Sequence, residues 1–320
     1  MGCRLKTTVE VQPDNSCPKS WPAMPIVSVI IPLYNARDVI SETIGSILAQ
    51  TWKDYEIVVI DDGSTDGSDQ VVLGVGSRLR YVRQENAGVA AARNRGIVES
   101  TGRYLALLDH DDLWHPTKLE KQVSLLDQRP EVGMVITDVA HIDREGRQMG
   151  ILGSGYNPSE TFARLFVQGY VPTPSAAMIR RSVLQATGGF DESFHSAGLD
   201  DHELWTRIAA HCAIASIPEP LTYHRNRELK PSHVALAHRS VLIPKLLARF
   251  GQDPEKRRYL LREQALYLAD RGKQLVVDGR GREGRAHLRQ ALRLSLLDVR
   301  SMKTTWRCVS RLIRSYLWSI

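Results

Sequence analysis

The order of apolar and polar residues in the first third of the chain predicts strands and helices in alternation. Ile26–Ile31 is an apolar run rich in β-branched residues, typical of a strand that is covered on both faces. Apolar residues then recur at helical spacing from Ile40 to Leu48. The same reading predicts strands at Glu56–Ile60, Arg80–Arg83 and Tyr104–Leu108, and a helix at Gly88–Ser100. Such alternation predicts an α/β fold with a mostly parallel sheet flanked by helices.

Two acidic loops follow neighbouring strands of this predicted sheet. The sequence DDGSTDG comes directly after the strand at Glu56–Ile60, and DHDD, Asp109–Asp112, comes after the strand at Tyr104–Leu108. In open parallel sheets the ligand crevice lies beyond the carboxyl ends of the strands. We therefore expect both loops to line one binding site.

The rest of the chain divides into a less regular part and a helical part. A helix is expected near Lys118–Gln128 and a strand over 132–137, and a short helix begins at the pair Asp200 and Asp201. From Pro231 onward strand patterns disappear, and Ala, Leu and Arg dominate. The pattern predicts an extended lead-in over 1–24, an α/β domain over 25–230, and a basic α-helical module over 231–320.

The charge of the chain is concentrated in that C-terminal module. The 320 residues are 42% hydrophobic and 24% charged, which is ordinary for a globular protein. The net charge is +6, but residues 231–320 carry 19 Lys and Arg against 7 Asp and Glu, whereas the residues before them carry 23 against 29. The α/β region also lacks a basic stripe with interleaved aromatics, so no nucleic-acid partner is expected.

Several features favour a cytoplasmic protein. No apolar run approaches the roughly 18 residues that a membrane-spanning helix needs, and the N-terminus lacks the hydrophobic core of a signal peptide. The four cysteines are scattered without a CxxC pair, which argues against a zinc site or a disulfide framework. We expect these cysteines to be reduced and structural.

The acidic loops indicate a nucleotide and a metal. Neighbouring carboxylates such as Asp109, Asp111 and Asp112 repel one another unless a positive charge, usually a metal ion, lies among them. Mg²⁺ or Mn²⁺ bound there can hold a diphosphate. Asp200 or Asp201 can act as a general base, or both can simply begin a helix, where the helix dipole favours ionised carboxylates.

Five stretches in the same order resemble one known family, the inverting family 2 glycosyltransferases of GT-A fold. They are VSVIIPLYN, QTWKDYEIVVIDDGSTDGS, ENAGVAAARNRGIVESTGRYLALLDHDDLWHPTKLEKQ, MIRRSVLQATGGFDESF and GLDDHELWTRIA. The resemblance covers about residues 25–228 and does not extend over the C-terminal module. It implies a GT-A type, Rossmann-like sheet.

The resemblance also implies a donor pocket. Asp62, the second acid of DDGS, matches the residue that contacts the nucleotide base in such enzymes, and Tyr34 of PLYN matches the same pocket wall. Arg93 of AARN looks like the residue that faces the donor nucleotide or its phosphates. The implied donor is a nucleotide-diphospho-sugar.

The metal site and the catalytic base follow from the same resemblance. Asp111 matches the metal-binding acid of the DxD motif, with Asp109 near the ribose or the metal, and the implied cofactor is Mn²⁺ or Mg²⁺. Asp201 matches the catalytic base, although Asp200 stands where the family more often has Glu. His224 is a further candidate for a metal or phosphate contact, in a loosely matching stretch.

The implied function is transfer of a sugar to a hydroxyl of a glycan or lipid-linked acceptor, in the synthesis of a cell-surface polysaccharide or glycoconjugate. One alternative is a sugar nucleotidyltransferase, but IPLYNARD offers no Gly-rich, cationic phosphate loop after the first strand. Another is a nucleotide-sugar-binding protein without turnover. The presence of Asp62, Asp111 and Asp201 argues against that second alternative without eliminating it.

The last residues of the chain have an amphipathic pattern. In 300–320, apolar residues such as Trp306 and Ile313 share one side of a helical wheel, and basic residues such as Arg307 and Arg311 flank it. Such a helix can lie on the anionic inner face of the cytoplasmic membrane, or its apolar side can pack on neighbouring helices. A lipid-linked acceptor would suit the first arrangement.

Overall fold

The computed structural model describes the greater part of the chain, namely residues 25–76, 79–152, 171, 173–194, 199–225, 232–296 and 310–311. The lead-in predicted over 1–24 lies outside the described residues. So does the amphipathic helix predicted over 300–320, apart from 310–311.

The first half of the chain forms the predicted parallel strands. These are β1 Val27–Leu33, β2 Tyr55–Asp61, β3 Arg80–Arg83 and β4 Tyr104–Leu107, in the spatial order β3-β2-β1-β4. All seven residues of β1 are buried, as expected for a central strand covered on both faces. Leu33, the last residue of β1, lies level with Asp61 of β2, so the loops after these strands leave the same edge of the sheet.

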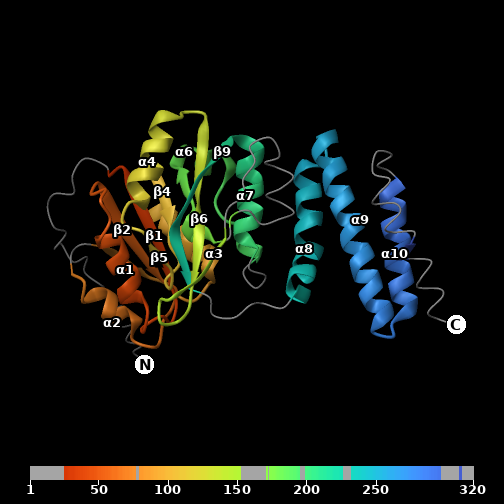
Figure 1. The fold of residues 1–320 in the computed structure, drawn as a ribbon, viewed down its shortest axis with the longest axis horizontal. Coiled ribbons are helices and arrows are strands. Elements are labelled where there is room, and N and C mark those ends of the chain that lie inside the picture. Colours follow the sequence, from red (N-terminus) through yellow and green to blue (C-terminus); the bar gives the residue numbers. More distant parts are fainter. Residues whose placement is uncertain are drawn as a thin grey trace, which may run out of the picture.

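Helices cover both faces of this sheet. They are α1 Ile40–Leu48, α2 Ser68–Leu73, α3 Val89–Glu99 and α4 Lys118–Gln128 (Figure 1). The side chains of α1 and α4 join one hydrophobic cluster and those of α3 contribute to others across the sheet. Gly96 lets α3 approach β1 closely, because a Cβ at this position would lie 2.3 Å from Cγ2 of Ile30.

The second half of the chain extends the same sheet with mixed pairing. β8 Met178–Arg180 is antiparallel to β4 and to β6 Val132–Ile142, while β9 Ala213–Arg225 is parallel to β6. The short strand β5 Leu113–Trp114 pairs with β9, and β7 Gln148–Leu152 pairs with β6. The α/β fold class is thus confirmed, and the antiparallel pairs are a feature that the sequence patterns had not specified.

β9 was not predicted from the sequence. It contains Pro218 and Pro220, and its register against β6 shifts near Pro220. Proline cannot donate to a strand ladder, so it weakens the pattern by which a strand is recognised. The irregularity is accommodated as a bulge, and β9 still carries the chain to the site edge of the sheet.

The remaining elements link the sheet to the C-terminal helices. Short helical turns occur at Pro174–Ala176 and Glu192–Phe194, α6 spans Arg181–Thr187, and α7 spans Asp200–His211. In α7 the apolar residues Leu204, Trp205 and Ile208 are buried against the sheet.

The C-terminal part consists of helices where it is described. α8 Ser232–Phe250, α9 Pro254–Val277 and α10 Gly281–Leu296 lie side by side, with α8 nearest to α7 (Figure 1). Asp253 caps α9 by accepting hydrogen bonds from the backbone N–H groups of Glu255 and Lys256, both at 3.0 Å. Within the part of the chain that the structure describes, no helix has the length and apolar character needed to cross a bilayer.

Candidate active site at the carboxyl edge of the sheet

The loops after β1 and β2 are joined by hydrogen bonds. The backbone N–H of Asn35 donates to Oγ of Ser64 at 3.1 Å, and the N–H of Thr65 donates to Oδ1 of Asn35 at 2.8 Å. Asn35 has a φ of 48°, a left-handed conformation that asparagine tolerates better than most residues. Tyr34 precedes this turn and is 47% exposed, which leaves its ring available to a ligand.

Asp62 directly follows β2 and accepts hydrogen bonds from residues at the start of α3. Its carboxylate accepts hydrogen bonds from Nε2 of Gln84 at 2.8 Å and from the backbone N–H groups of Ala87 at 2.9 Å and Gly88 at 2.8 Å. A carboxylate has about four acceptor positions, so capacity for a further donor remains. Asp62 can therefore accept one more hydrogen bond, and its contact with a nucleotide base is a prediction from the sequence.

Asp112, the last residue of the acidic loop after β4, anchors that loop by hydrogen bonds to neighbouring segments. This buried carboxylate accepts hydrogen bonds from Oγ of Ser175 at 2.6 Å and Oγ1 of Thr173 at 3.0 Å, and from the backbone N–H of Arg225 at 3.1 Å. Burial, together with the charges of Asp109 and Asp111, raises the pKa of Asp112 well above its usual value. Asp112 is therefore a structural support for the loop.

Arg93 connects the two acidic segments. From α3 its guanidinium donates to Oδ1 of Asp109 at 2.7 Å and to Oδ2 of Asp200 at 2.7 Å, and its side chain is only 5% exposed. Burial opposes the charge of Arg93, but the two carboxylates outweigh it and raise the pKa of Arg93. Both terminal nitrogens are occupied by carboxylates, so in this arrangement Arg93 bridges the two acidic segments.

The two acids that begin α7 are in different environments. Asp200 is 3% exposed, and its burial raises its pKa although Arg93 acts against this shift. Asp201 is partly exposed, and its Oδ1 accepts a hydrogen bond from the backbone N–H of His202 at 2.8 Å. Of the pair, Asp201 has the carboxylate that can meet a substrate.

The ends of β6 and β9 each add one histidine to the site. His224 lies beside His141 of β6, with 3.3 Å between their Nδ1 atoms. Burial and His141 lower the pKa of His224, while Asp111 and Asp109 are close enough to act in the opposite direction. The strand register that pairs His141 with His224 brings them together, and no spacing in the sequence indicates that pairing.

Arg225 is a second buried arginine that the sequence patterns did not identify. Its Nε donates to the backbone carbonyl of Asp111 at 3.1 Å, and its guanidinium also contacts the carbonyl of Arg144 at 2.6 Å and the carboxylate of Glu42 at 2.7 Å. Arg225 thus joins the backbone of Asp111, the candidate metal ligand, to Glu42 of α1.

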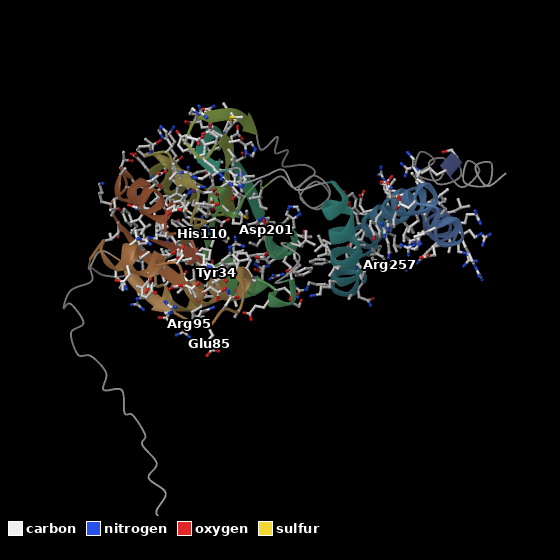
Figure 2. All side chains as sticks on the ribbon, turned by 90° about the horizontal axis from the view of Figure 1, so that it is seen from below. Tyr34, Glu85, Arg95, His110, Asp201 and Arg257 are labelled. Carbon is white, nitrogen blue, oxygen red and sulfur yellow. The ribbon has the colours of Figure 1, made fainter. Side chains whose placement is uncertain are left out.

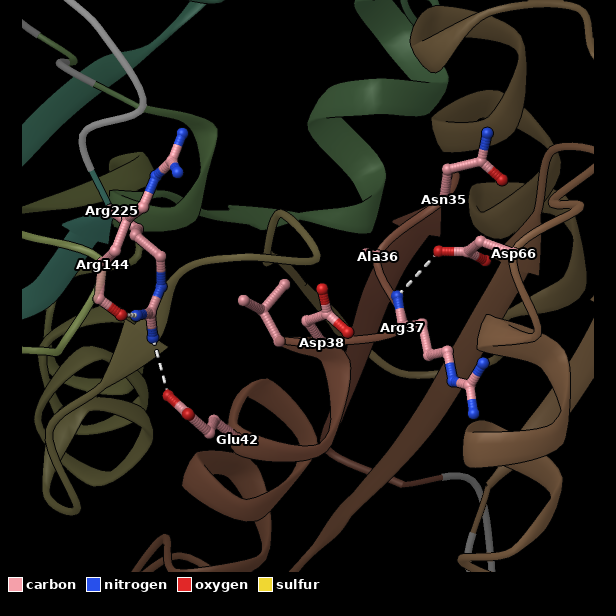
Figure 3. Close-up of a pocket in the computed structure, with 9 residues that line it drawn as sticks. Asn35, Ala36, Arg37, Asp38, Glu42, Asp66, Arg144 and Arg225 are labelled. Carbon is pink, nitrogen blue, oxygen red and sulfur yellow. Dashed lines mark hydrogen bonds and ion pairs between the residues drawn. The ribbon is translucent and has the colours of Figure 1, made fainter.

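A hollow of about 440 Å³ lies beside this arginine (Figure 3). It is lined by Asn35–Val39, Glu42, Asp66, Arg144 and Arg225. Neither Asp111 nor Asp201 lines it, so it adjoins the candidate site without containing the acids proposed to react or to bind metal.

The fold thus gathers the predicted residues from distant parts of the chain at one edge of the sheet. Figure 2 shows Tyr34, His110 and Asp201 in the α/β region, far from Arg257 in the C-terminal helices. Arg93 ties Asp109, two residues before Asp111, to Asp200, the neighbour of Asp201.

The donor atoms present fit a divalent cation that is held jointly with a ligand. Among the described residues, no group of three or more His, Cys, Asp or Glu side chains is arranged to hold a metal alone. Mg²⁺ is commonly bound by one or two carboxylates together with substrate phosphates. Asp111 and Asp109 can supply those carboxylates, and His224 lies near them.

Comparison with known proteins gives consistent results. Residues 28–188 match the model of a family described as glycosyl transferase family 2. An uncharacterized glycosyltransferase of Rickettsia typhi is 30% identical over 216 residues, which cover 66% of this chain and 67% of that protein. A putative teichuronic acid biosynthesis glycosyltransferase of Bacillus subtilis is 43% identical over 109 residues, which cover 33% of this chain and 43% of that protein.

A solved structure shares the fold. The crystal structure of S. aureus TarS 1-349 in complex with UDP-GlcNAc matches with a TM-score of 0.63 at 17% identity and covers 91% of this chain and 89% of that chain. The match extends beyond residue 188, so the similarity of fold includes parts that the family model does not cover.

Proposed function

The chain belongs to glycosyl transferase family 2, and on that premise we propose that it transfers a sugar from a nucleotide-diphospho-sugar to an acceptor hydroxyl with inversion at the anomeric carbon. The observation that supports this most is the Arg93 bridge, which brings the loop of Asp111 and the helix of Asp201 to one edge of the sheet.

In the proposed mechanism Asp201 is the general base. Its partly exposed carboxylate takes the proton of the acceptor hydroxyl, and the oxygen attacks the anomeric carbon from the face opposite the nucleotide. Asp200 cannot take this role in the same arrangement, because it is buried against Arg93. One carboxylate is sufficient for an inverting transfer.

Asp111, assisted by Asp109, would hold Mn²⁺ or Mg²⁺. A cation bound there supplies charge neutralisation for the departing nucleoside diphosphate. Asp62 and Tyr34 would receive the nucleotide base at the ends of β2 and β1. The exposed ring of Tyr34 and the remaining acceptor capacity of Asp62 support these roles.

The proposed donor is a UDP-sugar and the proposed acceptor is a surface glycan or its lipid-linked precursor. The UDP-GlcNAc complex of TarS supports the first, and the teichuronic acid relative supports the second. We place the protein at the cytoplasmic side of the membrane. Contact through 300–320 remains a prediction, for which binding to anionic liposomes with and without those residues is the test.

A direct experiment combines binding with turnover. UDP-, GDP- and dTDP-sugars are screened by thermal shift with and without Mn²⁺, and the stabilising donor is then incubated with candidate glycan acceptors. A Mn²⁺-dependent shift with one nucleotide class, followed by release of the nucleoside diphosphate, supports the proposal. Binding with no release for any acceptor would favour the non-catalytic alternative.

A further inference from the structure

Helix α8 packs on the segment that leads into α7. Leu242, Ile243 and Leu246 of α8 form a cluster with Phe194 and Leu199, and each of these five side chains is at most 5% exposed. Leu199 immediately precedes the first residue of α7. Helix α8 therefore shares a hydrophobic cluster with Leu199, the residue directly before the Asp200–Asp201 pair at the start of α7.

Two cations of α8 fasten the same contact. Nζ of Lys245 lies 2.9 Å from Oδ2 of Asp191 and also contacts Oγ of Ser193, and it is 4.2 Å from the ring centre of Phe194. One turn further along α8, Arg249 lies 3.2 Å from Oε1 of Glu203 in α7. These ion pairs reach α7 and the turn before it.

Glu203 connects α8 to the rest of the site. Its side chain is 3% exposed and also pairs with Arg207, which donates to the backbone carbonyls of Thr187 and Gly189, both at 2.6 Å. A carboxylate this deeply buried needs its cations, because an unpaired buried charge is costly. The network therefore fixes α7 against α6 on one side and α8 on the other.

We propose that α8 positions the catalytic carboxylate, with Lys245 and Arg249 acting through Asp191 and Glu203 to set the place of Asp201. This inference rests on the proposed function and extends it to a helix outside the matched family model. It also means that the residues before and after 230 form one functional unit.

The physical effect is on geometry more than on stability. Lys245 and Arg249 are 38% and 48% exposed, and the buried Glu203 keeps its pair with Arg207 when Arg249 is lost, so the cost to stability is limited. A displacement of a catalytic group by about 1 Å can, however, lower a rate by roughly 100-fold. Loss of the two cations should therefore reduce turnover while the donor site, which α8 does not touch through these residues, is preserved.

The test uses the full chain with Lys245→Met and Arg249→Met combined. Methionine keeps much of the apolar stem of each side chain and removes the charge. We expect kcat to fall about 10-fold, within the range known for misplaced catalytic groups. The affinity for UDP, measured by titration, should stay within about twofold of the wild type, because neither substitution removes a contact to the donor nucleotide.

The chain offers a matched control. Lys256 pairs with Asp253 at 2.9 Å and lies 5.8 Å from the ring of Phe250, and Arg280 pairs with Glu283 at 2.6 Å. None of these pairs involves the α/β region. The double variant Lys256→Met and Arg280→Met should keep wild-type kcat, and Lys245→Arg with Arg249→Lys should restore most of the lost turnover.

A second measurement separates this proposal from the proposed function. Backbone hydrogen exchange over 200–211 should accelerate in the Lys245→Met and Arg249→Met chain and stay unchanged in the control. Wild-type exchange and wild-type kcat in that chain would overturn the positioning role. Faster exchange in a protein that turns over no sugar nucleotide would retain the role of α8 in holding α7 and reject the glycosyltransferase mechanism.

Discussion

The ion pairs at the sheet edge and those of the C-terminal helices have similar distances and different surroundings. Arg93 lies 2.7 Å from each of two carboxylates and is 5% exposed, whereas Arg280 lies 2.6 Å from Glu283 and is 53% exposed. Distance alone does not distinguish them. Burial distinguishes them. When an exposed ion pair is broken, water solvates both charges, whereas a buried charge that loses its partner is left uncompensated.

This difference in burial explains why the charges at the sheet edge and those on α9 and α10 have different roles. At the sheet edge the buried Arg93 pairs with Asp109 and Asp200, so that one cation joins α3, the loop after β4, and α7. On α9 and α10 most charges face solvent, where they keep the surface hydrated and contribute little to the fold. Substitutions in the first region should therefore be much more damaging than the same substitutions in the second.

The largest difference is expected for Asp201→Asn. Loss of the proposed general base should lower kcat by roughly 10²- to 10⁴-fold while donor affinity persists. Steady-state kinetics with a titration of the nucleotide measures both. Asp278→Asn is the control from the C-terminal helices, where Asp278 accepts an exposed hydrogen bond from Gln274, and it should be silent. Near-normal turnover by Asp201→Asn would remove Asp201 from the role.

The next largest effect is expected on stability, from Arg93→Met. Removing the guanidinium leaves the carboxylates of Asp109 and Asp200 without their cation, which should lower the free energy of unfolding by about 3–5 kcal/mol. Arg95 is a control on the same helix, since it pairs with Glu99 at the same 2.7 Å but is 53% exposed. Arg95→Met should cost less than about 1 kcal/mol in urea unfolding. Equal losses would show that burial does not separate the two classes.

Asp111→Ala should weaken the proposed metal site. We expect the affinity for a Mn²⁺-nucleotide to fall at least about 10-fold, the scale found even for residues that only support a metal ligand. Calorimetric titration gives the affinity. Asp127→Ala, which removes an exposed partner of Arg103, should bind as the wild type does. Unchanged affinity in Asp111→Ala would reject its assignment as the metal ligand.

A smaller effect should depend on pH at the junction of the two regions. Burial alone would raise the pKa of Asp191, but hydrogen bonds from Ser193 and Lys245 lower it to about 2. A depressed folded-state pKa stabilises the fold above the unfolded value, near pH 4, and the contribution disappears as pH falls toward about 2. The stability gap between wild type and Asp191→Asn should follow that course in urea unfolding, and a gap independent of pH would contradict it.

The smallest effect is expected for Arg282→Gln combined with Arg293→Gln. Both arginines are exposed on α10, so the midpoint of thermal unfolding should change by about 1 °C or less. Scanning calorimetry at low and high salt measures it. A drop of several degrees would mean that these charges take part in a contact and would weaken the contrast between the regions.

The first four strands and the acidic loops after two of them could be predicted from the sequence, because each is a local pattern. Val27–Leu33 is apolar enough to be recognised as a buried strand, and Asp111 and Asp201 lie in motifs of a family with defined roles. β9 was missed because its prolines interrupt the pattern. His141 and Arg225 were missed as site residues because only strand register brings them there.

The α/β architecture, the family, and the positions of the acids at the ends of strands follow from the amino-acid sequence, since these depend on neighbours along the chain. Three features require the folded arrangement: Arg93 is shared between Asp109 and Asp200, Asp200 is buried while Asp201 is partly exposed, and α8 packs on the segment before α7. The reason is that desolvation and ion pairing depend on what surrounds a charge in space, and Arg93, for example, pairs with a carboxylate 107 positions away along the chain.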